Sequence, residues 1–224
     1  MDLISIYFLY FIIYSFIGWC LEVFDKFFEF KRFINRGFLI GPICPIYGFS
    51  VLFILLLIGD NSNDLLSVFL KSVFICSLLE YITSYLMEKL FKARWWDYSK
   101  YKFNINGRIC LETTLPFGIL GCVMVYIIHP IIIRLVTAIN PLLQLILTLV
   151  LFVIFIIDSV ISYNVMNKIK NEIIKQAADN TEMIKKKVLE FIDKRAGIYK
   201  HVKNAFPKFE IYKKLERFKN DKTN

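Results

Sequence analysis

Five long apolar stretches dominate this sequence of 224 residues. Each has 21 or more residues and few charges, and about 20 apolar residues in a helix cross the hydrocarbon core of a membrane. Backbone polar groups inside lipid must be paired within the segment, and the stretches lack the alternation typical of strands. We therefore predict an all-α fold: a polytopic membrane helix bundle of about five transmembrane helices. The predicted spans are residues 3–24, 38–58, 65–87, 113–133 and 141–166.

Lysine and arginine are distributed unevenly among the connections between these spans. Residues 25–37 carry four and residues 88–112 carry six, whereas residues 59–64 carry none and residues 134–140 carry one. The C-terminal residues 167–224 carry 16. Cytoplasmic connections are enriched in Lys and Arg, so we predict that the N-terminus lies outside and the C-terminus in the cytoplasm.

The apolar blocks end at Met166, which separates a transmembrane helical domain, residues 1–166, from a basic cytoplasmic tail, residues 167–224. In the tail, Ile169, Ile173 and Ile184 recur at helical spacing among lysines and glutamates, which predicts an amphipathic helix. A basic tail beside a membrane is expected to meet the lipid bilayer, and we expect no nucleic acid partner. A solvated tail without a specific role stays open, as does pairing with another copy or a partner.

The second apolar stretch has an irregular start, with Gly41, Pro42, Pro45 and Gly48 in its first turns. A proline is tolerated best at the beginning of a helix. A regular helix that begins at Pro45 leaves about 14 residues, or roughly 21 Å, which is short for a span. We predict a true span with an irregular entrance; the alternative is a broken or re-entrant helix.

Signatures of soluble enzymes are absent from the sequence. It contains no GxxxxGK[ST], GxGxxG, GxSxG or HExxH pattern, and its two histidines, His129 and His201, are far apart. The five cysteines form no CxxC pair, and no basic region precedes the first span, as it would in a signal peptide. We therefore predict no catalytic residue, no metal site and no cofactor, and we expect the first span to be retained.

Carboxylates at membrane depth are the first candidate site. Ionisable residues inside a span cost about 2.5–3.5 kcal/mol and usually face the bundle interior. Glu80, Ser84 and Glu88 share one helix face, which predicts a polar cavity, open to the cytoplasm, for a substrate, a cation or a proton. Asp158 lies within the fifth span. The alternative is a structural role, in which acidic residues near span ends pair with arginines: Glu22, Glu88 and Glu112 with Arg36, Arg94 or Arg108.

Two connections provide further candidates. Residues 35–42 precede the second helix, where free N–H groups beside Arg36 favour an anion such as a phosphate headgroup; the alternative is a simple turn. Residues 94–108 contain Arg94, Asp97, Asn104 and Arg108 together with two tryptophans. These rings are typical of an aromatic belt at the membrane interface, but the loop is also suited to roof a site or dock a partner.

Together these strings resemble a family of bacterial membrane proteins, the putative ABC-transporter type IV family, or CmpB-type putative ABC-transporter permeases. The similarity covers roughly residues 5–160 and leaves out the tail. It is carried by YSFIGW at 14–19 with Glu22, NRGFL at 35–39, GP at 41–42, CPIYG at 44–48, EY at 80–81, ME at 87–88, RWWDYS at 94–99, Asn104, and NGRICLE at 106–112.

The resemblance implies a transporter permease subunit of the bacterial cytoplasmic membrane, with a separate ATPase subunit as partner. We also expect a homo-oligomeric assembly. Its substrate is not implied. Two other functions stay open: a membrane-embedded lipid-handling enzyme, and a non-catalytic scaffold or sensor. The predicted substrate-binding or pathway residues are Glu22, Arg36, Glu80, Ser84, Glu88, Arg94, Asp97, Asn104, Arg108 and Glu112.

Overall fold

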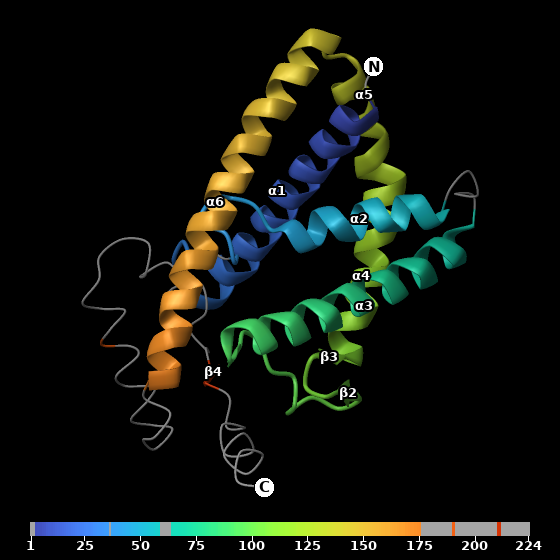
Figure 1. Cartoon of the computed structure of the whole chain (residues 1–224). Helices are drawn as coiled ribbons and strands as arrows, with labels where there is room; N and C mark the ends of the chain where they lie inside the picture. Colours follow the sequence, from blue (N-terminus) through green and yellow to red (C-terminus); the bar gives the residue numbers. More distant parts are fainter. Residues whose placement is uncertain (1–2, 36, 59–63, 176–189, 191–209, 212–224) are drawn as a thin grey trace, which may run out of the picture.

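The computed structural model describes residues 3–35, 37–58, 64–175, 190 and 210–211. The predicted all-α fold is confirmed (Figure 1). The helices are α1 (Leu3–Phe30), α2 (Pro45–Ile58), α3 (Leu65–Phe91), α4 (Leu111–Val123), the π-helical turn η1 (Met124–Ile128), α5 (His129–Thr137) and α6 (Pro141–Lys175). The strands have two residues each: β1 (Ala93–Arg94), β2 (Asn104–Ile105), β3 (Ile109–Cys110) and β4 (Glu210–Ile211).

Four helices of the described chain are long and apolar enough to cross a membrane. They cover Leu3–Phe28, Leu65–Phe91, Leu111–Thr137 and Pro141–Glu172, and the third of them combines α4, η1 and α5. The prediction of a membrane helix bundle is therefore confirmed. The predicted domain boundary at residue 166 lies inside α6, which continues to Lys175, and most of the predicted amphipathic tail lies outside the described residues.

The second predicted span contains a short regular helix. Its regular helix, α2, has only 14 residues, because it begins at Pro45. The residues before it form bends, in which Ile43 N–H bonds to the Gly41 carbonyl and Cys44 N–H bonds to the Ser15 carbonyl of α1. The expected irregular entrance is thus confirmed, and α2 is a shorter apolar helix beside the four that are long enough to cross a membrane.

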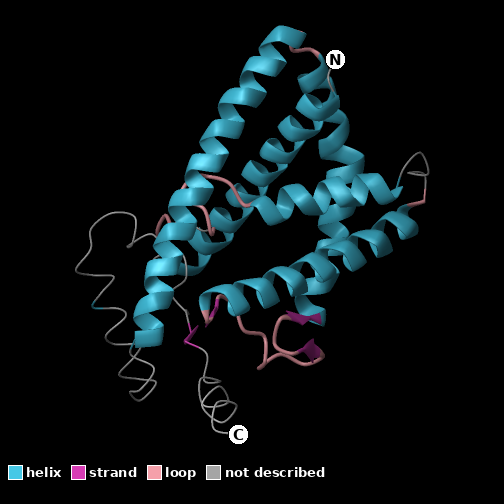
Figure 2. Cartoon of the chain, viewed as in Figure 1, coloured by secondary structure: helices cyan, strands magenta, loops and turns pink. Residues whose placement is uncertain are grey.

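The helices run in two main directions. Helices α1 and α6 run in the same direction, from the end with the N-terminus toward the end with the β2–β3 hairpin, and α4 to α5 returns between these ends (Figure 1). Helices α2 and α3 form a hairpin that crosses this direction in the same view. The connection between α3 and α4, residues 92–110, holds β2 and β3 at the lower end of the bundle (Figure 2), and we call it the α3–α4 loop. Strand β4 of the tail pairs with β1 at the start of this loop.

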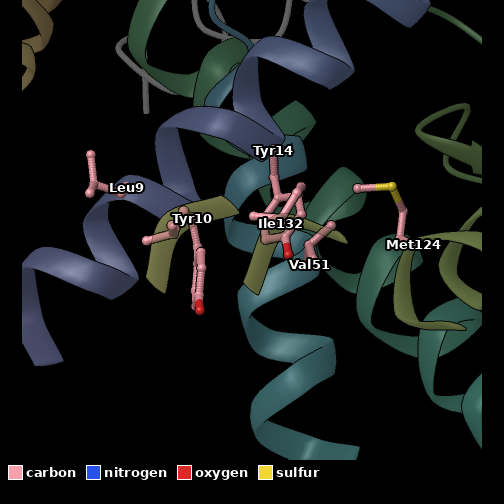
Figure 3. Close-up of a cluster of buried hydrophobic side chains, with 7 residues drawn as sticks. Leu9, Tyr10, Tyr14, Val51, Met124 and Ile132 are labelled. Atoms are coloured by element: carbon pink, nitrogen blue, oxygen red, sulfur yellow. The ribbon is translucent and has the colours of Figure 1, made fainter. Parts of the chain in front are cut away.

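Glycines allow the helices to approach closely at two crossings. A Cβ on Gly48 of α2 would lie 2.6 Å from the Phe11 carbonyl oxygen of α1, and a Cβ on Gly121 of α4 would clash with Ser72 of α3. Small residues at such contacts let backbones come together and gain packing energy in lipid. The buried cluster beside the first crossing joins α1, α2, η1 and α5; it contains Leu9, Tyr10, Tyr14, Val51, Met124, Ile132 and Val136 (Figure 3).

A widened turn, η1, interrupts the long helix that α4 and α5 form together. In η1, the His129 N–H bonds to the Met124 carbonyl, five residues back. Pro130 has no N–H, and its ring would collide with the Tyr126 carbonyl in a regular helix, so a π turn here relieves the clash. The turn brings the His129 Nδ1 atom to the Tyr14 hydroxyl of α1, with which it shares a hydrogen bond.

Candidate functional site

A cavity of about 150 Å³ lies inside the bundle. Helices α1, α2, α3 and α4 form its walls with η1, and the α3–α4 loop adds Trp96 and Tyr98. Most of the lining is apolar. Its polar side chains are Tyr14 and Glu22 from α1, Tyr47 and Ser50 from α2, Cys76 and Glu80 from α3, and Tyr98 from the loop.

Glu80 is the buried carboxylate of this cavity. Its side chain is only 7% exposed, and its Oε1 atom accepts a hydrogen bond of 3.2 Å from the Tyr98 hydroxyl. Its Oε2 atom is buried and has no hydrogen-bond partner in the described chain. Leaving a buried polar atom without a partner costs about 1–3 kcal/mol. Glu80 thus provides an open acceptor position in an apolar cavity.

Tyr98 keeps its proton in this environment. Burial, and then the negative charges of Glu80 and Glu22, raise the pKa of the Tyr98 hydroxyl well above its usual range. The hydroxyl is therefore a permanent donor to Glu80. On the opposite wall, the Tyr47 hydroxyl donates to Glu22 Oε1 at 2.8 Å. Each carboxylate of the cavity is thus oriented by a tyrosine from a different element.

Glu88 lies outside the cavity and anchors the α3–α4 loop. Its Oε2 atom accepts from Arg94 Nη2 at 3.1 Å and pairs with Arg108 Nη1 at 3.0 Å. Arg94 Nη1 also pairs with Asp97 Oδ1 at 3.1 Å. Both guanidinium groups are largely buried. The structural alternative for Glu88, pairing with Arg94 and Arg108, is what the structure shows.

Arg108 also binds the outer face of α3. Its Nη1 atom lies 3.5 Å from Ser84 Oγ, and its guanidinium lies over the rings of Tyr81 and Tyr85, at 5.6 Å and 5.3 Å from their centres. Cation–π contacts of this kind add to the attraction between the loop and the helix. The three residues predicted to share one face of α3 therefore have two different roles. Glu80 lines the cavity, while Ser84 and Glu88 hold the loop.

Asn104 shapes the hairpin at the end of the loop. Its Oδ1 atom accepts from the Gly107 N–H at 2.9 Å, and its Nδ2 atom donates to the Tyr101 carbonyl at 2.8 Å. Gly107 has φ +67°, which favours glycine, and a Cβ there would clash with Asp97. The Gly107 carbonyl accepts from the Tyr98 N–H at 2.8 Å. Asn104 therefore stabilises the turn that contains Gly107, and the Gly107 carbonyl in turn positions the backbone of Tyr98.

The two tryptophans of the loop point inward. Trp95 is buried, and Trp96 lines the cavity while its Nε1–H donates to the Arg108 carbonyl at 3.0 Å. An aromatic belt would place both rings at the lipid surface. Within the bundle, Trp95 is therefore part of the packed interior and Trp96 part of the cavity wall.

The segment before α2 is bound by the protein's own carboxylate. Asp158 of α6 accepts from the N–H of Ile40 at 3.0 Å and from the N–H of Gly41 at 2.9 Å, and the Ser162 hydroxyl donates to it at 3.1 Å. These N–H groups are the ones that the sequence suggested for an anionic headgroup, and Asp158 occupies them. Arg36, the predicted cation of this site, lies outside the described residues.

The remaining predictions divide between the cavity and the surface. Glu22 lines the cavity, whereas Glu112 is exposed in the first turn of α4. Within the described ranges, no group of three or more His, Cys, Asp or Glu side chains is arranged to hold a metal. Sequence reasoning missed Tyr14, Tyr47, Ser50 and Cys76, because an uncharged polar residue costs much less to bury in a span than a charged one and is therefore not conspicuous there.

The fold and the cavity define a membrane protein built as a helix bundle around a buried carboxylate. The chain belongs to the putative ABC-transporter type IV family, whose family model matches residues 9–163. The matched region includes every residue that lines the cavity, and it confirms the resemblance seen in the sequence. No curated protein and no solved structure matched the chain.

Proposed function

We propose that the chain is the permease subunit of a transporter, a multi-pass protein of the bacterial cytoplasmic membrane. The family supports a role in transport. The distribution of Lys and Arg supports an N-terminus outside and a C-terminus in the cytoplasm. Agreeing with this orientation, the α3–α4 loop with its five cations lies at the same end of the bundle as the end of α6 (Figure 1).

The observation that carries the proposal is the unpartnered Oε2 atom of Glu80. A purely structural carboxylate inside a bundle is expected to have both oxygens paired, because burial is costly otherwise. Here one oxygen is held by Tyr98, the other is buried without a partner in the described chain, and the residue lines a cavity formed by four helices and the loop. A substrate site accounts for this open acceptor, so Glu80 is the substrate-binding residue and Glu22 lies on the same pathway.

The α3–α4 loop is the docking surface for a separate ATPase subunit. The sequence has no P-loop, so ATP hydrolysis must come from another chain. The ion pairs of Glu88 hold the base of the loop, while its tip exposes Tyr101, Phe103 and Ile105. Phe103 is 80% exposed. A rigid loop with an apolar tip next to the cavity roof is suited to couple a bound ATPase to the site.

Affinity purification from native cells in mild detergent tests this proposal. We expect an ATP-hydrolysing subunit in a stoichiometric amount, and we expect Phe103→Ser to lose it. Phe33→Ser is the matched control, since Phe33 is an exposed phenylalanine of the other cation-rich connection. Absence of an ATPase from the wild-type preparation, or equal retention by Phe103→Ser, would overturn the proposal.

A further inference from the structure

A groove leads from the cavity to the outer surface of the bundle. It lies between α1 and α4, and it shares Leu21, Glu22, Tyr47, Phe117 and Leu120 with the cavity lining. Its outer part is formed by Asp25 of α1 and by Pro116, Ile119 and Val123 of α4. Ile119 is 62% exposed on a helix that is long and apolar enough to cross a membrane. The cavity therefore has a sideways opening toward the region that lipid tails occupy.

The inner end of this path selects for a particular chemistry. Glu80 presents its unpartnered Oε2 atom, while Tyr98 uses its hydroxyl proton on Oε1. A carboxylate oxygen in an apolar cavity attracts a cationic N–H donor, because charge-assisted hydrogen bonds are about twice as strong as neutral ones. It repels an anion such as a phosphate or a carboxylate.

The residues that line the cavity determine which kind of cation fits into it. Hard metal ions take six or more oxygen ligands or near-octahedral geometry, and the described residues contain no cluster that offers this. Apolar side chains dominate instead, among them Ile17, Phe117 and Leu120. A cavity of about 150 Å³ accommodates a body about the size of benzene. An organic ammonium with a small apolar body fits both the charge and the space.

We propose that the substrate of the permease is a lipophilic ammonium compound, which enters from the bilayer between α1 and α4 and donates an N–H hydrogen bond to Glu80 Oε2. This inference rests on the proposed function and names its substrate class. Glu22, which belongs to both the groove and the cavity, lies on the route. The apolar body packs against Phe117 and Leu120, where groove and cavity meet.

A binding measurement on the full chain in lipid nanodiscs tests the substrate class. The probes are benzylammonium, benzyl alcohol and benzoate, which share a ring and differ in charge. We expect benzylammonium to bind, benzyl alcohol to bind at least about tenfold more weakly, and benzoate not to bind. Equal binding of the charged and the neutral probe would overturn the inference. ATPase capture is a separate measurement, so failure of the permease proposal is recognised independently.

Variants assign the binding to Glu80 and the route to the groove. Glu80→Gln is expected to weaken benzylammonium binding by about tenfold or more, while the exposed Glu112→Gln leaves it unchanged. Ile119→Trp, at the mouth of the groove, is expected to slow association about fivefold or more, since a tryptophan adds bulk there; Leu142→Trp on exposed α6 is its control. Each variant must show the wild-type melting temperature. Unchanged affinity of Glu80→Gln overturns the ammonium site, and unchanged association with Ile119→Trp overturns the lateral route.

Discussion

The carboxylate of Asp158 accepts a hydrogen bond of 2.9 Å from the backbone N–H of Gly41, 117 residues earlier in the chain. With the bond from Ile40, this contact ties the irregular segment before α2 to the middle of α6. Backbone N–H groups that leave a helix in an apolar environment need such a partner. Asp158 is therefore the residue that makes the short α2 compatible with a membrane bundle.

Asp158→Asn should destabilise the bundle. The amide presents one acceptor oxygen and an NH₂ group, so one of the two backbone N–H groups loses its partner, at a cost of about 1–3 kcal/mol. The measurement is the thermal unfolding of the purified chain in detergent. Asp25→Asn is the control, because Asp25 is an exposed carboxylate whose ion-pair partner is its neighbour Lys26, at 2.8 Å. An equal melting temperature for the two variants would contradict this role of Asp158.

Glu88→Gln should release the α3–α4 loop. The change leaves the guanidinium groups of Arg94 and Arg108 largely buried without their shared carboxylate, and breaking a buried pair in this way costs about 3–5 kcal/mol. Hydrogen exchange in residues 94–108 is expected to accelerate strongly. Lys89→Gln, next along α3 and exposed, should leave the exchange unchanged. Protection of the loop in Glu88→Gln equal to that in the wild type would show that the ion pairs do not hold it.

The packing of the α3–α4 loop against α3 should weaken in acid, because the Asp97 carboxylate becomes protonated. Burial alone would raise the pKa of this carboxyl, but hydrogen bonds from the Ser99 hydroxyl and N–H, and the charge of Arg94, outweigh it and lower the pKa. A lowered folded-state pKa means that the stabilisation is complete above the unfolded value of about 3.9 and is lost as the pH falls through the folded value. Tryptophan fluorescence, measured over a pH range of about four units from pH 6 down to pH 2, should follow this loss.

Asp97→Asn supplies the comparison for this pH dependence. At pH 6, about two units above the unfolded pKa, its loop should be less protected than that of the wild type, and the difference should disappear at low pH. Asp25→Asn should retain the wild-type pH profile. A constant difference between wild type and Asp97→Asn across the whole range would show that the ionisation of Asp97 does not stabilise the loop.

Gly48→Ala should separate α1 from α2. The added Cβ would lie 2.6 Å from the Phe11 carbonyl oxygen, and a backbone atom cannot rotate away as a side chain does. Overpacking of this kind costs about 1–3 kcal/mol, which thermal unfolding in detergent would detect. Leu57→Ala, an exposed position of the same helix, should have a much smaller effect. The hypothesis fails if Gly48→Ala is as stable as the wild type.

The sequence predicted the bundle because apolar length and helical hydrogen bonding leave few alternatives in lipid. The same argument could not set the start of α2, because Pro42 and Pro45 are both acceptable near a helix start. The bonds of Ile40 and Gly41 to Asp158 decide it, and partners more than 100 residues apart are invisible to a local pattern.

The candidate site was predictable where charge was present. Glu80 was identified because a carboxylate in a span is costly and therefore informative. Tyr98 was not identified as the partner of Glu80, nor Tyr47 as the partner of Glu22, because the sequence contains 12 tyrosines and nothing local distinguishes these two. Glu88 could be assigned to the pathway or to an ion pair, and only the positions of Arg94 and Arg108 separated the two hypotheses.

The pairing of β4 with β1 has a consequence for biosynthesis. Arg94, which forms part of the loop anchor, has Glu210 as its strand partner, and Ala93 has Ile211. A ribosome therefore completes the four long apolar helices of the described chain before it makes the residues that cover this strand edge. A nascent chain carries an unprotected edge at the loop, which is open to wrong partners until residues 210–211 are synthesised.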